Sequence, residues 1–422
     1  MTYKKIYPSE SEPIRLLYIS QYYPPEVGAG AVRAEAMVRV LSTLGFRVDV
    51  LTETPNYPIG KIYPGYHAEW KRIDDAPSGT ITRLWVKINQ RSSILDQMVF
   101  FSSFMVSSFV HLISDSKPYD VIFVSSPPIF VSITAALISK LKGTKFVIEV
   151  RDLWPDSAVK DNLFAHQSWF IRLGRFIERW LYRSADRVIA VTEESAKVIE
   201  QKSGKQNTSV VYNGVDTEVF RFIPEGEMTI PDKKAKGKFR VGYVGSLGLI
   251  HDLHSLIRAA KCCEKETDIE FMIVGDGVKR DEMLSFMKDI NPSNIRWVGM
   301  KSHEEIPQYI STFDVAINPI NKSEAFKSIV TVKFYEYLAC EVPVISLAEG
   351  AQKSISDRSQ AGINCPVGDY IGLAETIKDL YRNPKKRQTL ANHARPFVEH
   401  EFSRTHQAHT LANTLKEILG RS

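Results

Sequence analysis

Short apolar runs alternate with longer segments of helical periodicity along the chain. In its first half, the runs predict β-strands, and helix-like stretches such as 31–44, which ends at Gly45, separate most of them. The expected strands are 14–20, 47–52, 81–86, 121–125, 145–150, 187–191 and 209–212. Because strands that alternate with helices usually form a parallel sheet, this pattern predicts an α/β fold.

The periodicity stops over residues 213–238 and then resumes. This segment gathers glycines, prolines and lysines, a composition typical of a linker or surface connection. The expected strands beyond it are 239–244, 270–274, 295–298, 315–317 and 342–346. We therefore expect two α/β domains, 1–220 and 221–400, followed by a helical end of the chain at 401–422.

Composition agrees with two ordinary globular domains. A chain of 422 residues exceeds what one hydrophobic core usually supports, although a single large barrel is an alternative. The net charge of +5 suits anionic partners but lacks the concentrated basicity of a nucleic-acid-binding protein. Four cysteines without metal-binding or disulfide spacing, and a charged segment at 1–13 without a signal-peptide core, favour the reducing cytoplasm.

Two segments bear on membrane contact. The apolar stretch 94–113 is interrupted by aspartate, glutamine, serine and histidine, which argues against a helix that spans a bilayer. Arginines recur every three or four residues from Arg172 to Arg187, beside Phe176 and Trp180. This stripe is either a solvated helix face or a surface for acidic headgroups. We interpret the two segments as a peripheral contact with the inner face of the cytoplasmic membrane.

Glycines follow several of the expected strands. Gly28 and Gly30 come after the first strand, Gly245 and Ser246 after the strand at 239–244, and Gly275, Gly277 and Gly299 after the next two strands. Backbone without side chains lets a phosphate or sugar approach closely. The spacing does not complete a dinucleotide fingerprint, and glycines at these places can also simply shape turns. We expect these residues to bind a nucleotide-sugar donor.

The most informative segment runs from 318 to 339. A loop that becomes a helix near Thr331 offers free backbone amides to a diphosphate, and Lys333 adds a cation. Glu336 lies one turn later on the same face, where a carboxylate can hold sugar hydroxyls. Arg151 and Asp152 follow the strand at 145–150, either as an ion-paired strand end or as catalytic residues. We expect Asp152 to orient or deprotonate an acceptor hydroxyl.

With these residues the chain resembles glycosyltransferase family 4, of the GT-B fold, especially bacterial polysaccharide enzymes of the N-acetylfucosaminyl and colanic-acid types. The resemblance spans nearly the whole chain. Besides the glycine loops and the Glu336 helix, it rests on Arg-Asp-Leu-Trp-Pro-Asp at 151–156, Ser-Ala-Asp-Arg-Val-Ile at 184–189, Asn-Gly-Val-Asp at 213–216 and Val-Gly-Asp-Gly at 274–277.

The resemblance implies two facing Rossmann-like domains with mainly parallel sheets and a cleft between them. Residues 1–220 then bind the acceptor, residues 221–400 bind a nucleotide-sugar, most simply a UDP-sugar, and the helix at 401–422 returns to the first domain. It also implies transfer with retention of configuration, without a metal or a cofactor other than the nucleotide-sugar co-substrate. The implied acceptor is a glycan or a polyprenyl-diphosphate-linked glycan in bacterial surface polysaccharide or lipopolysaccharide synthesis.

The chain departs from the family pattern at two places. Glu336 matches the second glutamate of a pair separated by seven residues, but Ser328 stands in place of the first. The family's basic pair corresponds roughly to Ser246 and His251, which leaves Lys333 as the stronger diphosphate ligand. Two alternatives therefore stay open: a noncatalytic nucleotide-sugar-binding subunit of an assembly, and a nucleotide-sugar 2-epimerase.

Overall fold

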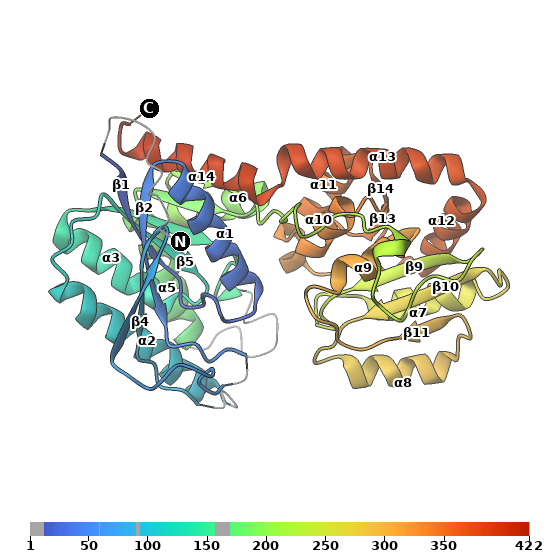
Figure 1. Ribbon diagram of the computed structural model, residues 1–422, viewed down its shortest axis with the longest axis horizontal. Helices are drawn as coiled ribbons and strands as arrows, with labels where there is room; N and C mark the ends of the chain where they lie inside the picture. The colour runs from blue at the N-terminus through green and yellow to red at the C-terminus, as the bar shows by residue number, and fades with distance from the viewer. Residues whose placement is uncertain (1–11, 59, 90–92, 157–168, 422) are drawn as a thin grey trace. The chain divides into compact units, whose positions relative to one another are not determined.

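The computed structural model describes residues 12–58, 60–89, 93–156 and 169–421. Residues 1–11 lie outside this range. They make up most of the segment 1–13, which we expected not to be a signal peptide. The chain divides into two compact units (Figure 1). Unit 1 comprises 1–213 and 407–422, and unit 2 comprises 214–406. The division thus falls at 213–214 and 406–407, whereas the sequence placed it at 220–221 and 400–401.

Unit 1 contains one mainly parallel sheet. Its described strands are β1 (Ile14–Ile19), β2 (Phe46–Glu53), β3 (Lys71–Ala76), β4 (Gly79–Leu84), β5 (Val121–Ser126), β6 (Lys145–Val150), β7 (Arg187–Ala190) and β8 (Thr208–Val210), in the order β3-β4-β2-β1-β5-β6-β7-β8. Only the pairing of β3 with β4 is antiparallel among these strands. Nearly continuous apolar runs form the inner strands because both faces of the sheet are covered.

Helices cover both faces of this sheet. Side chains of α1 (Ala29–Thr43) and α14 (Arg404–Ile418) pack against Leu16 and Tyr18 of β1. On the other face, Leu17 and Ile19 of β1 share a core with side chains of α2 (Ile94–Ser114), α3 (Phe130–Lys142), α5 (Trp169–Ser184) and α6 (Glu193–Ser203). The alternation of inward side chains along β1 therefore builds two cores, one on each face of the sheet.

Unit 2 repeats this architecture with a fully parallel sheet. Its described strands are β9 (Phe239–Val244), β10 (Ile269–Val274), β11 (Ile295–Trp297), β12 (Val315–Pro319), β13 (Val344–Leu347) and β14 (Gly362–Cys365), in the order β11-β10-β9-β12-β13-β14. The helices are α7 (Leu253–Cys262), α8 (Arg280–Ile290), α9 (Ile306–Ser311), α10 (Val332–Ala339), α11 (Gly350–Ser359), α12 (Tyr370–Arg382) and α13 (Pro384–Glu401), with short 3₁₀ turns at Glu225–Glu227 and Glu324–Ser328.

The predicted α/β class is confirmed, since each unit is a mainly parallel sheet with intervening helices (Figure 1). The strands β3 and β14 were not predicted. The stretch 94–113 forms most of α2, and Leu95–Ser114 is long and apolar enough to cross a membrane by length and composition alone, a test that the core helix of a soluble protein also passes. Ser107 and Ser108, two of the polar residues within it, are buried in unit 1.

Candidate functional site

Two glycine-containing loops meet at the carboxyl ends of β9 and β10 in unit 2. The amide of Gly245 donates a hydrogen bond to the carbonyl of Val274 (2.9 Å), and that of Gly275 donates to the carbonyl of Gly299 (2.9 Å). Gly275 has a φ of +135°, and a Cβ there would lie 2.0 Å from the Gly245 carbonyl oxygen. Only glycine fits this close approach, so the loops pack backbone against backbone.

A cavity of about 320 Å³ opens beside these loops. Four of the residues expected to bind the donor line it, namely Gly245, Ser246, Gly275 and Glu336. The other lining residues are Phe220, Val244, Val274, Asp276, Met300, Lys301, His303 and Ile306. The position fits a ligand site, because parallel α/β sheets bind ligands beyond the carboxyl ends of their strands.

Lys333 lies in the first turn of α10, buried beneath the Gly245 loop. Its Nζ donates a hydrogen bond to the hydroxyl of Tyr243 (2.7 Å) and lies 3.2 Å from Nε2 of His251. A Cβ at Gly245 would stand 2.7 Å from this Nζ, so the glycine leaves room for the lysine. Burial lowers the pKa of Lys333 to about 7, despite the opposing effect of Glu336. An anion bound at the loop would therefore raise the pKa of Lys333 again and favour its protonated form.

Glu336 is half-buried in the cavity, one turn further along α10. Burial raises the pKa of its carboxyl to about 7, while the charges of Arg404 and Lys333 oppose that rise. A carboxyl group with this pKa can donate or accept a hydrogen bond near neutral pH. Glu336 thus lines the cavity, and Lys333 lies beneath the adjoining Gly245 loop. Shifted pKa values of this kind are common at functional sites.

Three other predicted donor residues support this site without lining the cavity. Gly277 packs on the loop below, where a Cβ would lie 2.5 Å from the carbonyl oxygen of Leu247. Gly299 accepts the hydrogen bond from Gly275. Thr331 precedes α10, and its hydroxyl is 3.0 Å from Oδ1 of Asn318. Their contacts fix the loops and the start of the helix.

Sequence reasoning missed the far wall of the cavity. Phe220 and His303 meet edge to face with ring centroids 5.4 Å apart, and Lys301 and Met300 precede His303 in the same loop. Burial and the nearby Arg404 lower the pKa of His303, which favours the neutral ring. No sequence motif indicates these residues. Phe220, for example, belongs to the segment 213–238, whose composition is typical of a linker.

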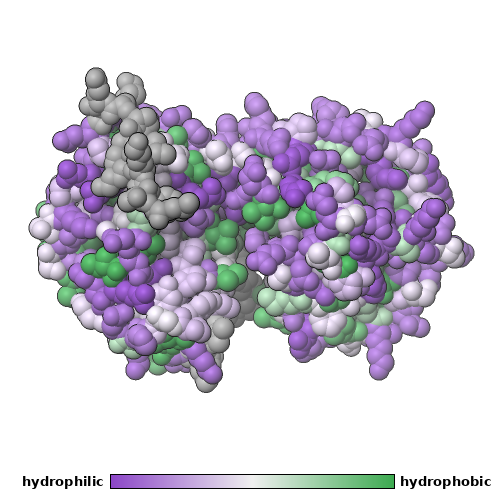
Figure 2. Space-filling view, in the orientation of Figure 1, coloured by the Kyte–Doolittle hydropathy of each residue, from purple (hydrophilic) through white to green (hydrophobic). Residues whose placement is uncertain are grey.

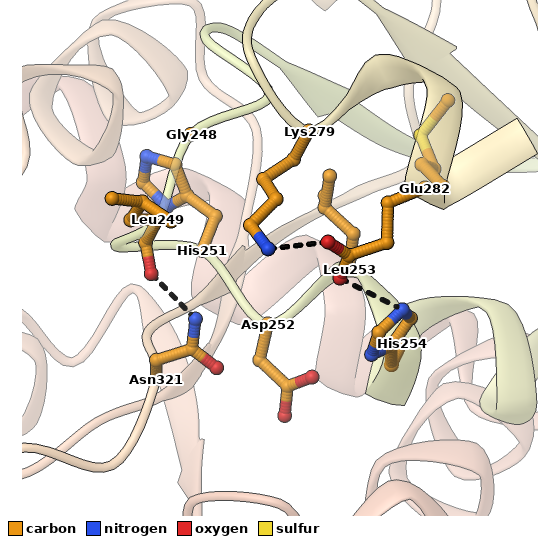
Figure 3. Close-up of a pocket in the computed structure, with 10 residues that line it drawn as sticks. Gly248, Leu249, His251, Asp252, Leu253, His254, Lys279, Glu282 and Asn321 are labelled. Carbon is orange, nitrogen blue, oxygen red and sulfur yellow. Dashed lines mark hydrogen bonds and ion pairs between the residues drawn. The ribbon is translucent and has the colours of Figure 1, made fainter. Parts of the chain in front are cut away.

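A second cavity, of about 250 Å³, is lined in part by Gly248 and Leu249 of the loop that follows β9 (Figure 3). His251, His254, Lys279 and Glu282 line it, and Glu282 pairs with both Lys279 and His254. The Nδ2 of Asn321 donates a hydrogen bond of 2.6 Å to the Leu249 carbonyl across it. Burial, reinforced by Lys333, lowers the pKa of His251 to about 3. The loop therefore carries a neutral histidine between the cavity and the buried lysine.

The remaining predicted residues belong to unit 1. Gly28 precedes α1, and a Cβ at Gly30 would lie 2.8 Å from the Arg151 guanidinium. Arg151 donates to the Ser125 hydroxyl (3.0 Å) and to the carbonyl of Pro127 (2.9 Å). Asp152 follows it with an exposed side chain. The residues expected to bind the donor are thus divided between the two units.

Arg151 is part of a buried ionic network. Arg33 pairs with Glu149 at 2.8 Å, and the Ser125 hydroxyl donates to the other oxygen of Glu149 at 2.6 Å. Burial alone raises the pKa of Glu149, but the charges of Arg33 and Arg151 bring it below its usual value. Because its guanidinium is engaged in this network, Arg151 positions the carboxyl end of β6, from which Asp152 projects.

The sequence matches two family models that together cover most of the chain. Residues 28–214 match the glycosyl transferase 4-like domain, and residues 238–383 match the glycosyl transferases group 1. The chain belongs to glycosyltransferase family 4. The glycosyltransferase has the GT-B fold, and each family model corresponds to one of its two units.

Curated relatives are similar over long stretches of this glycosyltransferase. The probable glycosyltransferase WbjE of Pseudomonas aeruginosa is 25% identical over 284 residues, which cover 66% of the chain and 70% of WbjE. The putative colanic acid biosynthesis glycosyl transferase WcaI of Escherichia coli K12 is 24% identical over 346 residues, or 79% of the chain and 83% of WcaI.

Solved structures share the fold. Sucrose-phosphate synthase from Thermosynechococcus elongatus superposes with a TM-score of 0.76 at 17% identity, covering 97% of the glycosyltransferase and 100% of the synthase. Anabaena HepE in complex with UDP-glucose has a TM-score of 0.67 at 16% identity, with 96% and 100% of the two chains covered.

Proposed function

We propose that this glycosyltransferase transfers a sugar from a UDP-sugar to a lipid-linked glycan, with retention of configuration and without a metal, in bacterial surface polysaccharide synthesis. Unit 2 binds the donor and unit 1 binds the acceptor. The observation that carries the proposal is the buried Lys333 beneath the Gly245 loop, with Glu336 in the adjoining cavity.

The donor diphosphate fits the start of α10 and the Gly245 loop. Unpaired amides at a helix start favour anions, and a phosphate near Lys333 stabilises its protonated form. Glu336 then accepts hydrogen bonds from hydroxyl groups of the donor. The base and ribose occupy the cavity beside His303, whose ring packs edge to face on the buried Phe220.

In the transfer step, the bond between the sugar's anomeric carbon and the diphosphate oxygen breaks, and the acceptor oxygen forms its bond on the same face. Negative charge grows on the leaving diphosphate, where the Lys333 cation and the backbone amides stabilise it. The acceptor hydroxyl proton passes to the departing phosphate oxygen. Asp152 orients this hydroxyl from unit 1, or takes the proton first.

The comparisons support the proposed substrates. HepE was solved with UDP-glucose, and WcaI is named for colanic acid biosynthesis. The helices of unit 1 support a lipid-linked acceptor, because α2 and α5 expose apolar side chains.

A mass-spectrometric transfer screen tests the proposal. UDP-, GDP- and dTDP-sugars are paired with detergent-presented polyprenyl-diphosphate glycans, and both acceptor mass and released nucleotide are followed. We expect a glycosylated lipid with a UDP-sugar and a product of retained configuration by NMR. Asp152→Asn should lose turnover while it keeps donor affinity, and full turnover in this variant would remove the role of Asp152.

Ser328 in place of the family's first glutamate favours a second candidate, a nucleotide-sugar-binding subunit without catalysis. Donor binding without turnover on any acceptor in the same screen would support it. A 2-epimerase would instead yield an altered nucleotide-sugar without a glycosylated acceptor.

A further inference from the structure

Three neighbouring helices of unit 1 form an outer layer over one face of the sheet. Helix α3 contacts both α2 and α5. Each helix buries one side in the same core, through Phe100 and Phe104 of α2, Ile138 of α3 and Leu181 of α5. Their opposite sides therefore face outward together.

The outward side of α2 is apolar along its whole length. Leu95, Val99, Val106, Val110 and Ile113 are between 44% and 70% exposed. Their spacings of four, seven, four and three residues place them on one stripe of the helix. Apolar residues that are scattered singly are normal on the surface of a soluble protein, whereas a contiguous apolar stripe indicates an interaction surface.

The adjacent helices extend this stripe. Leu137 and Leu141 are exposed on α3, and Leu173 and Phe176 are exposed on α5, with Phe176 at 67%. Figure 2 shows apolar patches on the part of unit 1 that α2 and α3 occupy in Figure 1. We name nine exposed apolar residues of the three helices the outer helix surface: Leu95, Val99, Val106, Val110, Ile113, Leu137, Leu141, Leu173 and Phe176.

The exposed charged side chains of these three helices are positive. Lys140, Arg172, Arg179 and Arg183 are exposed. The acids of the same helices are engaged elsewhere: Asp96 bonds to Ser93 at the start of α2, and Glu178 is buried against Lys202 and Tyr182. An apolar surface with exposed cations and engaged acids is complementary to an anionic lipid bilayer.

We propose that the outer helix surface docks unit 1 onto an anionic bilayer, with α2 lying along the membrane plane. A spanning orientation does not fit this fold, because Phe100, Phe104 and Leu112 of α2 are buried in the core of unit 1. The apolar stripe enters the boundary between headgroups and acyl chains, and the arginines and Lys140 contact the phosphates. This inference deepens the proposed lipid-linked acceptor by naming the surface that brings the enzyme to it.

Vesicle flotation of the full chain tests the surface directly, without turnover. Vesicles of phosphatidylcholine with phosphatidylglycerol are compared with phosphatidylcholine alone. We expect flotation on the anionic vesicles, a loss of about tenfold or more in affinity for Val106→Asp with Val110→Asp, and a similar loss for Arg172→Glu with Arg179→Glu. Ile371→Asp, an exposed apolar residue of α12 in unit 2, is the matched control and should float normally.

Circular dichroism melting and UDP binding establish that each variant is folded. Equal flotation of the wild type and both double variants would overturn the proposal. An absence of flotation would overturn it too. If gel filtration then shows a dimer, and Val106→Asp with Val110→Asp dissociates that dimer, a second copy of the chain covers the surface instead of a membrane. Transfer to a soluble acceptor is measured in parallel, so a failure of the docking surface is distinguished from a failure of the proposed reaction.

Discussion

The Nζ of Lys333 lies 2.7 Å from the hydroxyl of Tyr243, at the end of β9. The same nitrogen stands 4.0 Å from the centre of that tyrosine ring. The lysine is thus held by a neutral hydroxyl and an aromatic face, with a neutral histidine beside it. None of these groups supplies a full negative charge, and a bound diphosphate would.

Replacement of Lys333 by methionine should weaken UDP binding. Methionine keeps much of the volume but removes the cation, and a hydrogen bond to a charged group contributes about 1.5–3 kcal/mol, or roughly 10- to 100-fold in affinity. Isothermal titration calorimetry measures the change. Lys288→Met, on the exposed face of α8, is the control and should bind UDP normally. Unchanged affinity in Lys333→Met would place the diphosphate elsewhere.

UDP affinity should fall as the pH rises through neutrality. The pKa values of Lys333 and Glu336 are both about 7, so over this range the lysine loses its positive charge and the carboxyl gains a negative one. Both changes disfavour an anion, and we expect a loss of about tenfold between pH 6 and 8.5. Titration calorimetry across this range should show a shallower slope for Lys333→Met, in which only Glu336 titrates. Identical slopes would contradict the assignment, because the ionisation of UDP is common to both proteins.

Gly275→Ala should both destabilise unit 2 and reduce UDP binding. The new Cβ would meet the Gly245 carbonyl oxygen at a φ of +135°, and overpacking together with backbone strain costs about 2–5 kcal/mol. Gly237→Ala is the comparison, since its φ is +82° but its Cβ would meet no atom within 4 Å. It should cost about 1–2 kcal/mol in urea unfolding and leave UDP affinity unchanged. Equal effects of the two variants would show that backbone strain alone matters.

Arg33→Met should destabilise unit 1 by about 3–5 kcal/mol, because it leaves the buried Glu149 without its nearest counter-charge. It also removes donors from the carbonyls of Val211 and Tyr212. Arg39→Met breaks an exposed pair with Glu35 at 3.4 Å and should cost less than about 1 kcal/mol. Urea unfolding followed by tryptophan fluorescence compares the two, and a loss as small as that of Arg39→Met would show that the network contributes little.

Strands buried on both faces were predictable because they are almost entirely apolar, as β9 and β12 are. The edge strand β3 was missed because its sequence, Lys-Arg-Ile-Asp-Asp-Ala, is charged, and β14 because Gly-Ile-Asn-Cys has no clear period. Such edge strands depend on a neighbouring strand rather than on their own pattern.

The candidate site divides in the same way. Gly245, Gly275 and Lys333 follow strands or begin a helix, so their place at the carboxyl edge of the sheet follows from local sequence. Phe220 and His303 meet only through the tertiary fold, and no local pattern announces them. The contacts of Arg151 likewise depend on Ser125 of β5 and on Glu149 of β6, the strand that Arg151 follows.

The return of α14 to unit 1 bears on how the chain folds during synthesis. Ala408, Leu411, Ala412 and Leu415 complete a core that otherwise comes from the first half of the chain. All of unit 2 is translated before these residues, so it can fold on the ribosome while unit 1 still exposes part of its apolar core. Unit 1 is therefore translated first, but its core is completed only after unit 2 has been synthesised. Until α14 packs onto it, unit 1 exposes an apolar surface that a chaperone can bind.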